Sequence, residues 1–291
     1  MFSVIKSGMD TALHELSMIS NNISNANSTG FKKSSVSFSE FYNGRTAEGV
    51  ESVLVGLGSN AQDTRRSDSQ GALVERGGAL DAAIVGNGYF MTQNADQLGY
   101  SATRNGAFSL DSDGFLVAQD GDFVLGMTAV DGEFVGMAPD ATMLQRIQIP
   151  INEAMDPLSS VSISSNGHIS AAFGKEDEIP VGTLSLSIFS NPNGLKQLGN
   201  GKYAPTDLSG KLFIGNPNSA GFGKLETGYV EGSNVDITTE MTNMIRAQQQ
   251  FNGAARIMQT NSDMIEKINN SLPYADIQYG EGEARFICVK N

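Results

Sequence analysis

The stretch "ISNNISNANSTGF", residues 19–31, decides how this sequence is interpreted. It holds four asparagines, three serines and one threonine, and it directly follows a helix-like pattern. Asn and Ser side chains compete for backbone hydrogen bonds and so favour helix ends and turns. Gly30 is also suited to a left-handed C-cap. A simple helix end needs only about two such residues, and the larger number predicts that the amides also contact a partner.

The residues before and within this stretch carry one apolar stripe. Apolar side chains recur at alternating spacings of three and four, which predicts a helix over residues 2–28. The stripe consists of Phe2, Ile5, Met9, Ala12, Leu16, Ile19 and Ile23. A helix that lies on a globular core has a similar stripe, so this helix alone favours the simpler interpretation.

A second helix-like pattern lies near the other end. Asp236 is its predicted N-cap, Glu240 falls in the first turn, and the segment contains no proline. Two heptad-like helices at opposite ends predict that they pair as a coiled-coil-like domain, although buried helices of two separate domains would show the same pattern. Gln248 and Ser262 interrupt the apolar positions, which are Ile237, Met241, Met244, Phe251, Ala255, Met258 and Ile265.

Short β-rich runs separated by turn residues fill the middle of the chain. Two-residue hairpin signals are Asn-Gly at 87, 105 and 166 and Asp-Gly at 113, 120 and 131. The predicted fold is therefore mixed and mainly β, with paired terminal helices around an all-β, hairpin-rich domain. The predicted boundaries are 1–30 for the first helix and Asn-rich segment, 31–70 for an extended arm or linker, 71–232 for the β domain, 233–270 for the second helix and 271–291 for a tail without assignment.

The composition excludes several classes of partner. The formal net charge of −13 argues against nucleic acid and anionic membranes. Cys288 is the single cysteine and has no internal partner for a disulfide. We expect no membrane insertion and no cleaved signal peptide, because no apolar run is long enough for either. These features predict a cytoplasmic address unless another export route operates.

The search for catalytic and ligand-binding motifs predicts no enzyme, no cofactor and no metal site. His14 and His168 are the only histidines and lie in different regions. The acidic run at 111–122 departs from a calcium loop, because Gly114 arrives at position 4 and not at position 6. Hairpin turns explain this run more simply.

Several motifs together resemble one family, the flagellar rod and hook proteins, which are the axial subunits of the bacterial flagellum. "ISNNISNANSTGFKK" (19–33) resembles the N-terminal motif of that family, and "GYVEGSNVDITTEMTNMIRAQQQF" (228–251) resembles its C-terminal motif. Its β-domain core is similar to "GGALDAAIVGNGYFMTQ" (77–93), "NGAFSLDSDGFLVAQDGDFVLG" (105–126) and "IFSNPNGLKQLGNGKYAPT" (188–206).

The resemblance implies a non-enzymatic subunit that assembles into a helical homopolymer, with paired terminal helices lining a tube and a β domain outside. It implies neighbouring rod and hook subunits, surrounding ring proteins and the flagellar export apparatus as partners. It also implies a place in the basal body, spanning the periplasm, after export without a cleaved signal peptide. This route replaces the cytoplasmic address expected from composition.

Within the family a rod subunit is favoured, since "EGSNV" is typical of rod proteins and the chain is too short for the extra β domain of hook proteins. A hook subunit is the alternative, because "EMTNMIRAQ" is more typical of the hook. A β-rich carbohydrate-binding protein or hydrolase is a more distant alternative, and the absence of Trp argues against it.

The residues expected to form subunit contacts come from both terminal motifs. They are Phe2, Ile5, Met9, Leu16, Ile19, Asn21, Asn22, Ile23, Asn25, Asn27, Thr29, Gly30, Phe31, Ser233, Asn234, Val235, Met241, Met244, Ile245, Phe251, Met258 and Ile265.

Overall fold

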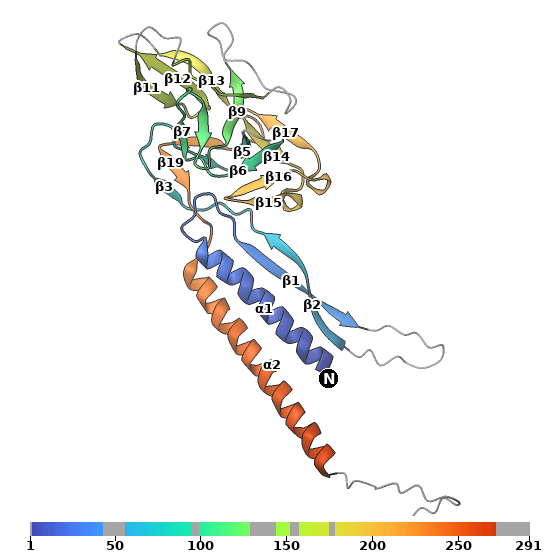
Figure 1. Cartoon of the computed structure of the whole chain (residues 1–291). Helices are drawn as coiled ribbons and strands as arrows, with labels where there is room; N and C mark the ends of the chain where they lie inside the picture. The colour runs from blue at the N-terminus through green and yellow to red at the C-terminus, as the bar shows by residue number, and fades with distance from the viewer. Residues whose placement is uncertain are drawn as a thin grey trace, which may run out of the picture.

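The computed structural model describes residues 2–42, 56–94, 99–128, 144–151, 157–174 and 178–271. Two long helices and a β-hairpin lie at one end of an elongated molecule, and the remaining strands gather at the other end (Figure 1). A mainly β chain with a helix near each end and a β-rich middle is therefore confirmed. The predicted tail lies outside the described residues except for Ser271, as do Cys288 and the Asp-Gly pair at 131.

The terminal helices α1 (Phe2–Ser24) and α2 (Ile237–Ser271) lie side by side, run antiparallel and contact each other. The predicted cap is confirmed, because Asp236 Oδ1 accepts a hydrogen bond from Thr239 N at 2.8 Å. This backbone hydrogen bond lowers the pKa of Asp236. A coiled-coil geometry for the pair stays a prediction.

Helix α2 is longer than α1 and extends past its start (Figure 1). It has 35 residues against 23, which corresponds to about 18 Å of extra length at ~1.5 Å per residue. Asn22 contacts Glu240 near the top of the pair. Because the helices run antiparallel from this contact, the last ten or so residues of α2 lie beyond the start of α1.

The face of α2 toward α1 differs in part from the predicted stripe. Met241 and Ile265 are 55% and 50% exposed, whereas Glu240 and Ala247 are 5% and 1% exposed. The Glu240 carboxylate accepts a hydrogen bond from Asn22 Nδ2 at 3.1 Å, and a small residue at 247 leaves room for the neighbouring helix. The predicted residues that are half-buried on α2 are Met244, Phe251, Ala255 and Met258.

The segment predicted as an extended arm forms a hairpin instead. Strands β1 (Ser34–Tyr42) and β2 (Gly56–Arg66) pair antiparallel and lie along α1. Gly58 permits this approach, since its φ is +104° and a Cβ there would lie 2.1 Å from Ser7 Oγ. The prediction missed the hairpin because the serines of β1 hide its alternation of side chains.

The β domain is built on a branched antiparallel sheet. The path of hydrogen-bonded neighbours is β11 (Leu158–Ile163), β12 (His168–Phe173), β13 (Ile179–Leu184), β9 (Phe123–Thr128), β5 (Tyr89–Gln93), β6 (Tyr100–Thr103), β16 (Lys202–Ala204) and β15 (Lys196–Gly199). Its branches are β7 (Phe108–Leu110), β8 (Leu116–Ala118), β10 (Gln145–Arg146), β14 (Leu186–Phe189) and β17 (Leu212–Gly215). Two separate pairs are β4 (Ala82–Val85) with β18 (Lys224–Thr227), and β3 (Leu73–Glu75) with β19 (Tyr229–Glu231).

Three of the predicted hairpin turns are confirmed. The turns at 113, 120 and 166 join the paired strands β7–β8, β8–β9 and β11–β12. The predicted hairpins at 87 and 105 are wrong. Residue 87 follows β4, which pairs with β18, and residue 105 precedes β7, which pairs with β8. In the Asn105–Gly106 pair, glycine is required because the two backbones lie close together. A Cβ on Gly106 would lie 1.7 Å from Ala82 O.

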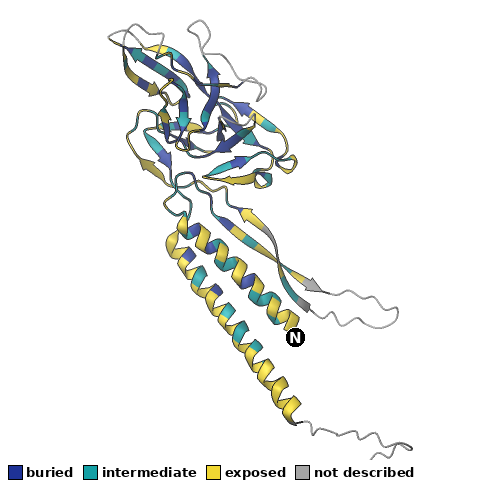
Figure 2. Ribbon diagram, viewed as in Figure 1, coloured by how far each residue is buried: buried dark blue, intermediate teal, exposed yellow. Residues whose placement is uncertain are grey.

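Strand β5 separates two hydrophobic cores. Phe90 belongs to one core with Leu116, Ile169 and Leu186, whereas its neighbour Met91 belongs to the other. Successive side chains of a strand point to opposite faces, so one strand serves both cores. Figure 2 shows the resulting concentration of buried residues in the β domain and the mostly exposed surface of the helices. The β domain therefore has its own hydrophobic interior.

Candidate assembly site and the joint that supports it

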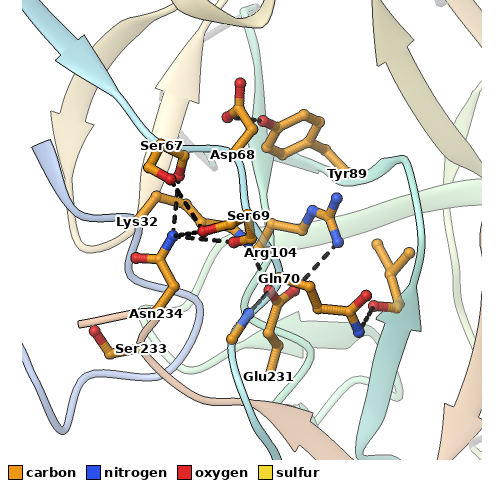
Figure 3. A network of polar contacts seen from close by, with 12 residues as sticks. Lys32, Ser67, Asp68, Ser69, Gln70, Tyr89, Arg104, Glu231, Ser233 and Asn234 are labelled. Atoms are coloured by element: carbon orange, nitrogen blue, oxygen red, sulfur yellow. Dashed lines mark hydrogen bonds and ion pairs between the residues drawn. The ribbon is translucent and has the colours of Figure 1, made fainter. Parts of the chain in front are cut away.

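Three loops meet where the helices reach the β domain. They are residues 25–33 between α1 and β1, 67–72 between β2 and β3, and 232–236 between β19 and α2. We call their meeting point the joint, defined by residues 30–34, 66–71 and 231–234 together with Arg104 (Figure 3). The predicted terminal motifs are thus brought together here.

Glu231 lies at the centre of the joint and is 0% exposed. Its Oε1 accepts hydrogen bonds from Lys32 Nζ at 2.6 Å and from Gly71 N at 2.9 Å. Its Oε2 accepts one from Arg104 Nη1 at 3.2 Å. Lys32 and Arg104 are themselves 1% and 5% exposed. A buried charge is costly unless it is paired, so these groups depend on one another.

Burial lowers the pKa of Lys32, although the neighbouring Glu231 carboxylate favours the charged ammonium. Lys32 Nζ also donates to Ser69 O at 2.9 Å. Two buried cations of the joint, Lys32 and Arg104, therefore share one fully buried carboxylate, while the third, Arg66, pairs with the partly exposed Asp68. The excess of positive charge is consistent with the lowered pKa.

Asn234 connects the three loops. Its Oδ1 accepts a hydrogen bond from Lys33 N at 2.7 Å, and its Nδ2 donates to Ser67 O and Ser69 O, each at 3.0 Å. Ser233 Oγ accepts one from Val235 N at 3.3 Å. These predicted assembly residues therefore make contacts inside the chain, and a role between subunits stays a prediction.

Asn22 was predicted to bond to a neighbouring subunit, and the structure gives it partners inside the chain. It is 2% exposed. Its Nδ2 donates to Ser34 O at 2.8 Å and to Glu240 Oε2, and its Oδ1 accepts from Ser34 N at 3.0 Å. One side chain therefore connects α1, β1 and α2.

The other asparagines of the motif differ from Asn22. Asn25 Nδ2 donates to Asn21 O at 2.9 Å, which is a local contact at the end of α1. Asn21 and Asn27 are exposed. With Asn25 they line a polar groove of about 680 Å³ that faces the turn at residues 199–202 of the β domain. Asn21, Asn25 and Asn27 therefore lie at an open polar groove, and a contact with a second chain there stays a prediction.

Gly30 was considered as the C-cap of the first helix, and that prediction is wrong. Helix α1 ends at Ser24, six residues earlier. Gly30 has a φ of +69°, and a Cβ on it would lie 2.6 Å from Asn105 N. Its N–H donates to Glu231 O at 2.7 Å. Glycine is required because the backbones of the joint approach each other closely.

Aromatic rings and arginines reinforce the joint from the side of the β domain. The Arg66 guanidinium lies 4.1 Å from the centre of the Tyr203 ring, and Arg104 lies 5.2 Å from that of Tyr89. The two rings pack edge to face at 6.0 Å. The Tyr89 hydroxyl donates to Asp68 Oδ1 at 3.1 Å, and burial raises its pKa. The joint is therefore continuous with a core of the β domain.

The helices also expose many apolar side chains. On α2 they have exposed fractions between 45% and 59%, and they are Ile237, Met241, Ile245, Ile257, Met264, Ile265 and Ile268. On α1 they are Phe2, Val4 and Leu13. Figure 2 shows that this exposure continues along α2 to its far end. Large exposed apolar patches are typical of interaction sites.

The predicted assembly residues fall into three classes of exposure. Exposed are Phe2, Asn21, Asn27, Met241, Ile245 and Ile265. Half-buried are Ile5, Met9, Leu16, Ile23, Asn25, Thr29, Phe31, Ser233, Asn234, Val235, Met244, Phe251 and Met258. Buried are Ile19, Asn22 and Gly30.

The sequence did not identify Lys32, Arg104, Glu231 or Glu240 as site residues. Glu231 directly follows the apolar pair Tyr229–Val230 and precedes Gly232, a setting unusual for a solvated carboxylate. That setting was the available signal for its burial. Its partner Lys32 lies 199 residues away in the chain, and no local pattern links the two.

The described residues contain no group of three or more His, Cys, Asp or Glu side chains that could hold a metal ion. Among the helices within the described ranges, none combines the length and the apolar composition that crossing a membrane requires. The site is thus defined by side-chain contacts between segments and by exposed apolar surface.

Comparisons with known proteins agree with this architecture. The model described as "Flagella basal body rod protein" matches residues 4–32. The model "Flagellar hook protein FlgE/F/G D1 domain" matches residues 83–171, and "Flagellar basal body rod FlgEFG protein C-terminal" matches residues 226–271. The chain belongs to the flagellar rod and hook protein family.

Within this family the chain is similar to rod proteins over nearly its whole length. The flagellar basal-body rod protein FlgG of Bacillus subtilis (strain 168) is 34% identical over 274 residues, covering 91% of this chain and 96% of the relative. FlgG of Agrobacterium fabrum (strain C58) is 31% identical over 283 residues, covering 93% and 98%. The flagellar hook protein FlgE of Salmonella typhimurium is 34% identical over 113 residues, which cover 39% of this chain and 28% of the relative.

Proposed function

We propose that this chain is a structural subunit of the flagellar rod that polymerises through its terminal helices. The exposed apolar surface of α2 carries the proposal. Met264 and Ile265 are 58% and 50% exposed, and the helix lengths and the Asn22–Glu240 contact place them beyond the start of α1. Burying apolar surface against a second copy contributes about 25 cal/mol per Å². The same contact repeated without closure builds a helical filament.

The rod is favoured over the hook by the extent of similarity. The two rod relatives named above match over 93% and 91% of this chain, whereas the hook relative matches over 39%. The relatives carry the names of structural proteins, and a structural rather than an enzymatic role is the conclusion for this chain. Its neighbours in the flagellum are other axial subunits.

The finer proposal concerns position and mechanics. In a rod, the helix pair lines a tube that serves as an export channel, and the β domain lies outside, where it meets adjacent subunits and surrounding ring proteins. Rigid helices packed side by side transmit torque along the axis. The subunit reaches this periplasm-spanning place through the flagellar export apparatus, without a cleaved signal peptide.

The test replaces the two exposed residues at the far end of α2. Met264→Ser combined with Ile265→Ser removes apolar surface while leaving the joint and the β domain unchanged. We expect the protein to fold, as judged by circular dichroism, but the basal bodies isolated from the source bacterium to lack complete rods. Swimming in soft agar should fail for the same reason.

A matched control replaces two exposed polar residues of the same segment, Gln259→Ser with Lys267→Ser. These changes lower helix propensity to a similar degree but remove little apolar surface. The control should swim and form complete rods. Normal rods and normal swimming in the Met264 and Ile265 variant would contradict the proposal.

A further inference from the structure

We propose that Glu231 is a positioning residue that fixes the direction of the helix pair relative to the β domain. The proposal goes beyond polymerisation and concerns the free chain. Besides Glu231, the loops 67–72 and 232–236 connect the two parts, and Arg66 at the end of β2 adds a hydrogen bond to Pro192 O and a contact with the Tyr203 ring. Short loops of this kind act as hinges when the contacts across them are weakened. A hinge must be held if every copy is to enter an assembly with the same shape.

Every hydrogen bond to the Glu231 side chain comes from a different segment. Lys32 belongs to the loop after α1, Gly71 to the loop after the hairpin, and Arg104 follows β6 in the β domain. The backbone of Glu231 adds a fourth connection, from Gly30 N to Glu231 O. Figure 3 shows Lys32 and Arg104 converging on the Glu231 carboxylate. Rotation at either hinge breaks several of these contacts at once.

The two oxygens of the Glu231 carboxylate bind different partners, so the contacts fix the orientation of the side chain. Oε1 receives Lys32 and Gly71, while Oε2 receives Arg104. Arg104 is held in turn, since its Nη2 donates to Gly86 O at 2.8 Å and its guanidinium lies over Tyr89. The carboxylate therefore connects the helical side of the joint to a group that is fixed in the β domain.

An amide at position 231 cannot replace the carboxylate, because the Glu231 side chain neutralises the buried charges of Lys32 and Arg104. Gln has nearly the same shape, but one end of its amide is a donor and cannot accept a hydrogen bond from Lys32 or Arg104. Glu231→Gln also leaves two buried cations without a buried anion. Lys32 must then leave the joint or lose its proton, and either change removes the ion pair between the loop after α1 and β19, leaving the backbone hydrogen bond from Gly30 N.

The test measures the distance between the two parts of the free chain by pulsed electron spin resonance. Spin labels are placed at Ser159→Cys in β11 and Gln249→Cys in α2, both exposed, in a Cys288→Ser background. We expect one narrow distance distribution for the parent chain. We expect Glu231→Gln to broaden it by about twofold or more, because both ion pairs across the joint are then lost and the loops are held more weakly.

Two controls separate positioning from general destabilisation. A label pair inside the β domain, Ser159→Cys with Ser190→Cys, should keep its width in the Glu231→Gln variant. Glu226→Gln removes the carboxylate of an exposed pair with Lys224, also 2.6 Å long, and should leave both distributions unchanged. An unchanged width between Ser159 and Gln249 in folded Glu231→Gln would overturn the proposal.

A second variant applies if Glu231→Gln broadens the label pair within the β domain, which would indicate unfolding. Lys32→Gln keeps the pair between Glu231 and Arg104 and removes the ammonium that contacts Glu231 and Ser69 O. Broadening between Ser159 and Gln249 in this variant supports the proposal, and a parental width overturns it. The measurement uses unassembled protein, so its failure is distinguishable from a failure of polymerisation.

Discussion

The β domain and the helix pair bury their side chains in different ways. The β domain encloses large apolar residues such as Phe90, Leu116 and Leu186, each 0% exposed. Between the helices, the buried apolar residues are small or few, namely Ala12, Ile19 and Ala247, and polar Asn22 and Glu240 lie beside them. The difference teaches that the β domain carries its own stability, whereas the helices keep much of their apolar surface for partners.

The largest expected effect is on the free energy of unfolding, when phenylalanine is replaced by alanine in the β domain and in α2. Phe90→Ala should lower the free energy of unfolding of the β domain by about 3–5 kcal/mol, because it opens a cavity in a closed core. Phe251→Ala, at a half-buried position of α2, should cost the free chain about 1 kcal/mol or less. Denaturant unfolding followed by circular dichroism measures both. Equal losses would remove the distinction between the regions.

A smaller effect separates two neighbouring asparagines. Asn22→Ala leaves Ser34 and Glu240 without their partner at a buried site, at a cost of about 1–3 kcal/mol. Asn25→Ala removes a local contact at the helix end and should be nearly neutral in the free chain. Hydrogen exchange of α1 measures the difference. If both variants exchange like the parent, the contacts of Asn22 do not stabilise the helix pair.

The features of the fold that the sequence predicts correctly are those encoded by residues close together in the chain. The two helices, the Asp236 cap and the hairpins at 113, 120 and 166 depend on local patterns, and all are present. The joint depends on residues such as Lys32 and Glu231 that lie far apart in the chain. Which amide of the Asn-rich stretch points inward also depends on tertiary packing.

The helix seam shows the same limit in detail. A heptad pattern ranks positions by hydrophobicity and therefore selects Met241 over Glu240. In the structure Glu240 is buried because Asn22 supplies a hydrogen bond, and Met241 is left exposed. The apolar residues that misled the prediction of the seam are those now proposed to face neighbouring subunits.

The smallest expected effect concerns the start of α2 and its pH dependence. The Thr239 N–H holds the folded-state pKa of Asp236 below its ordinary value. The contribution of this cap is therefore present above the unfolded-state pKa and is lost as the pH falls below about 4. Asp236→Asn keeps an acceptor without a charge, so hydrogen exchange of the first turn should show less pH dependence. An identical pH profile for both chains would rule out this role.

The measurement that tests the account most directly is electron cryomicroscopy of basal bodies isolated from the source bacterium. The account predicts this chain in the rod, with Met264 and Ile265 of α2 packed against neighbouring subunits near the central channel and the β domain outside. A subunit located outside the axial structure would contradict the account, as would a rod in which the far end of α2 remains exposed to solvent.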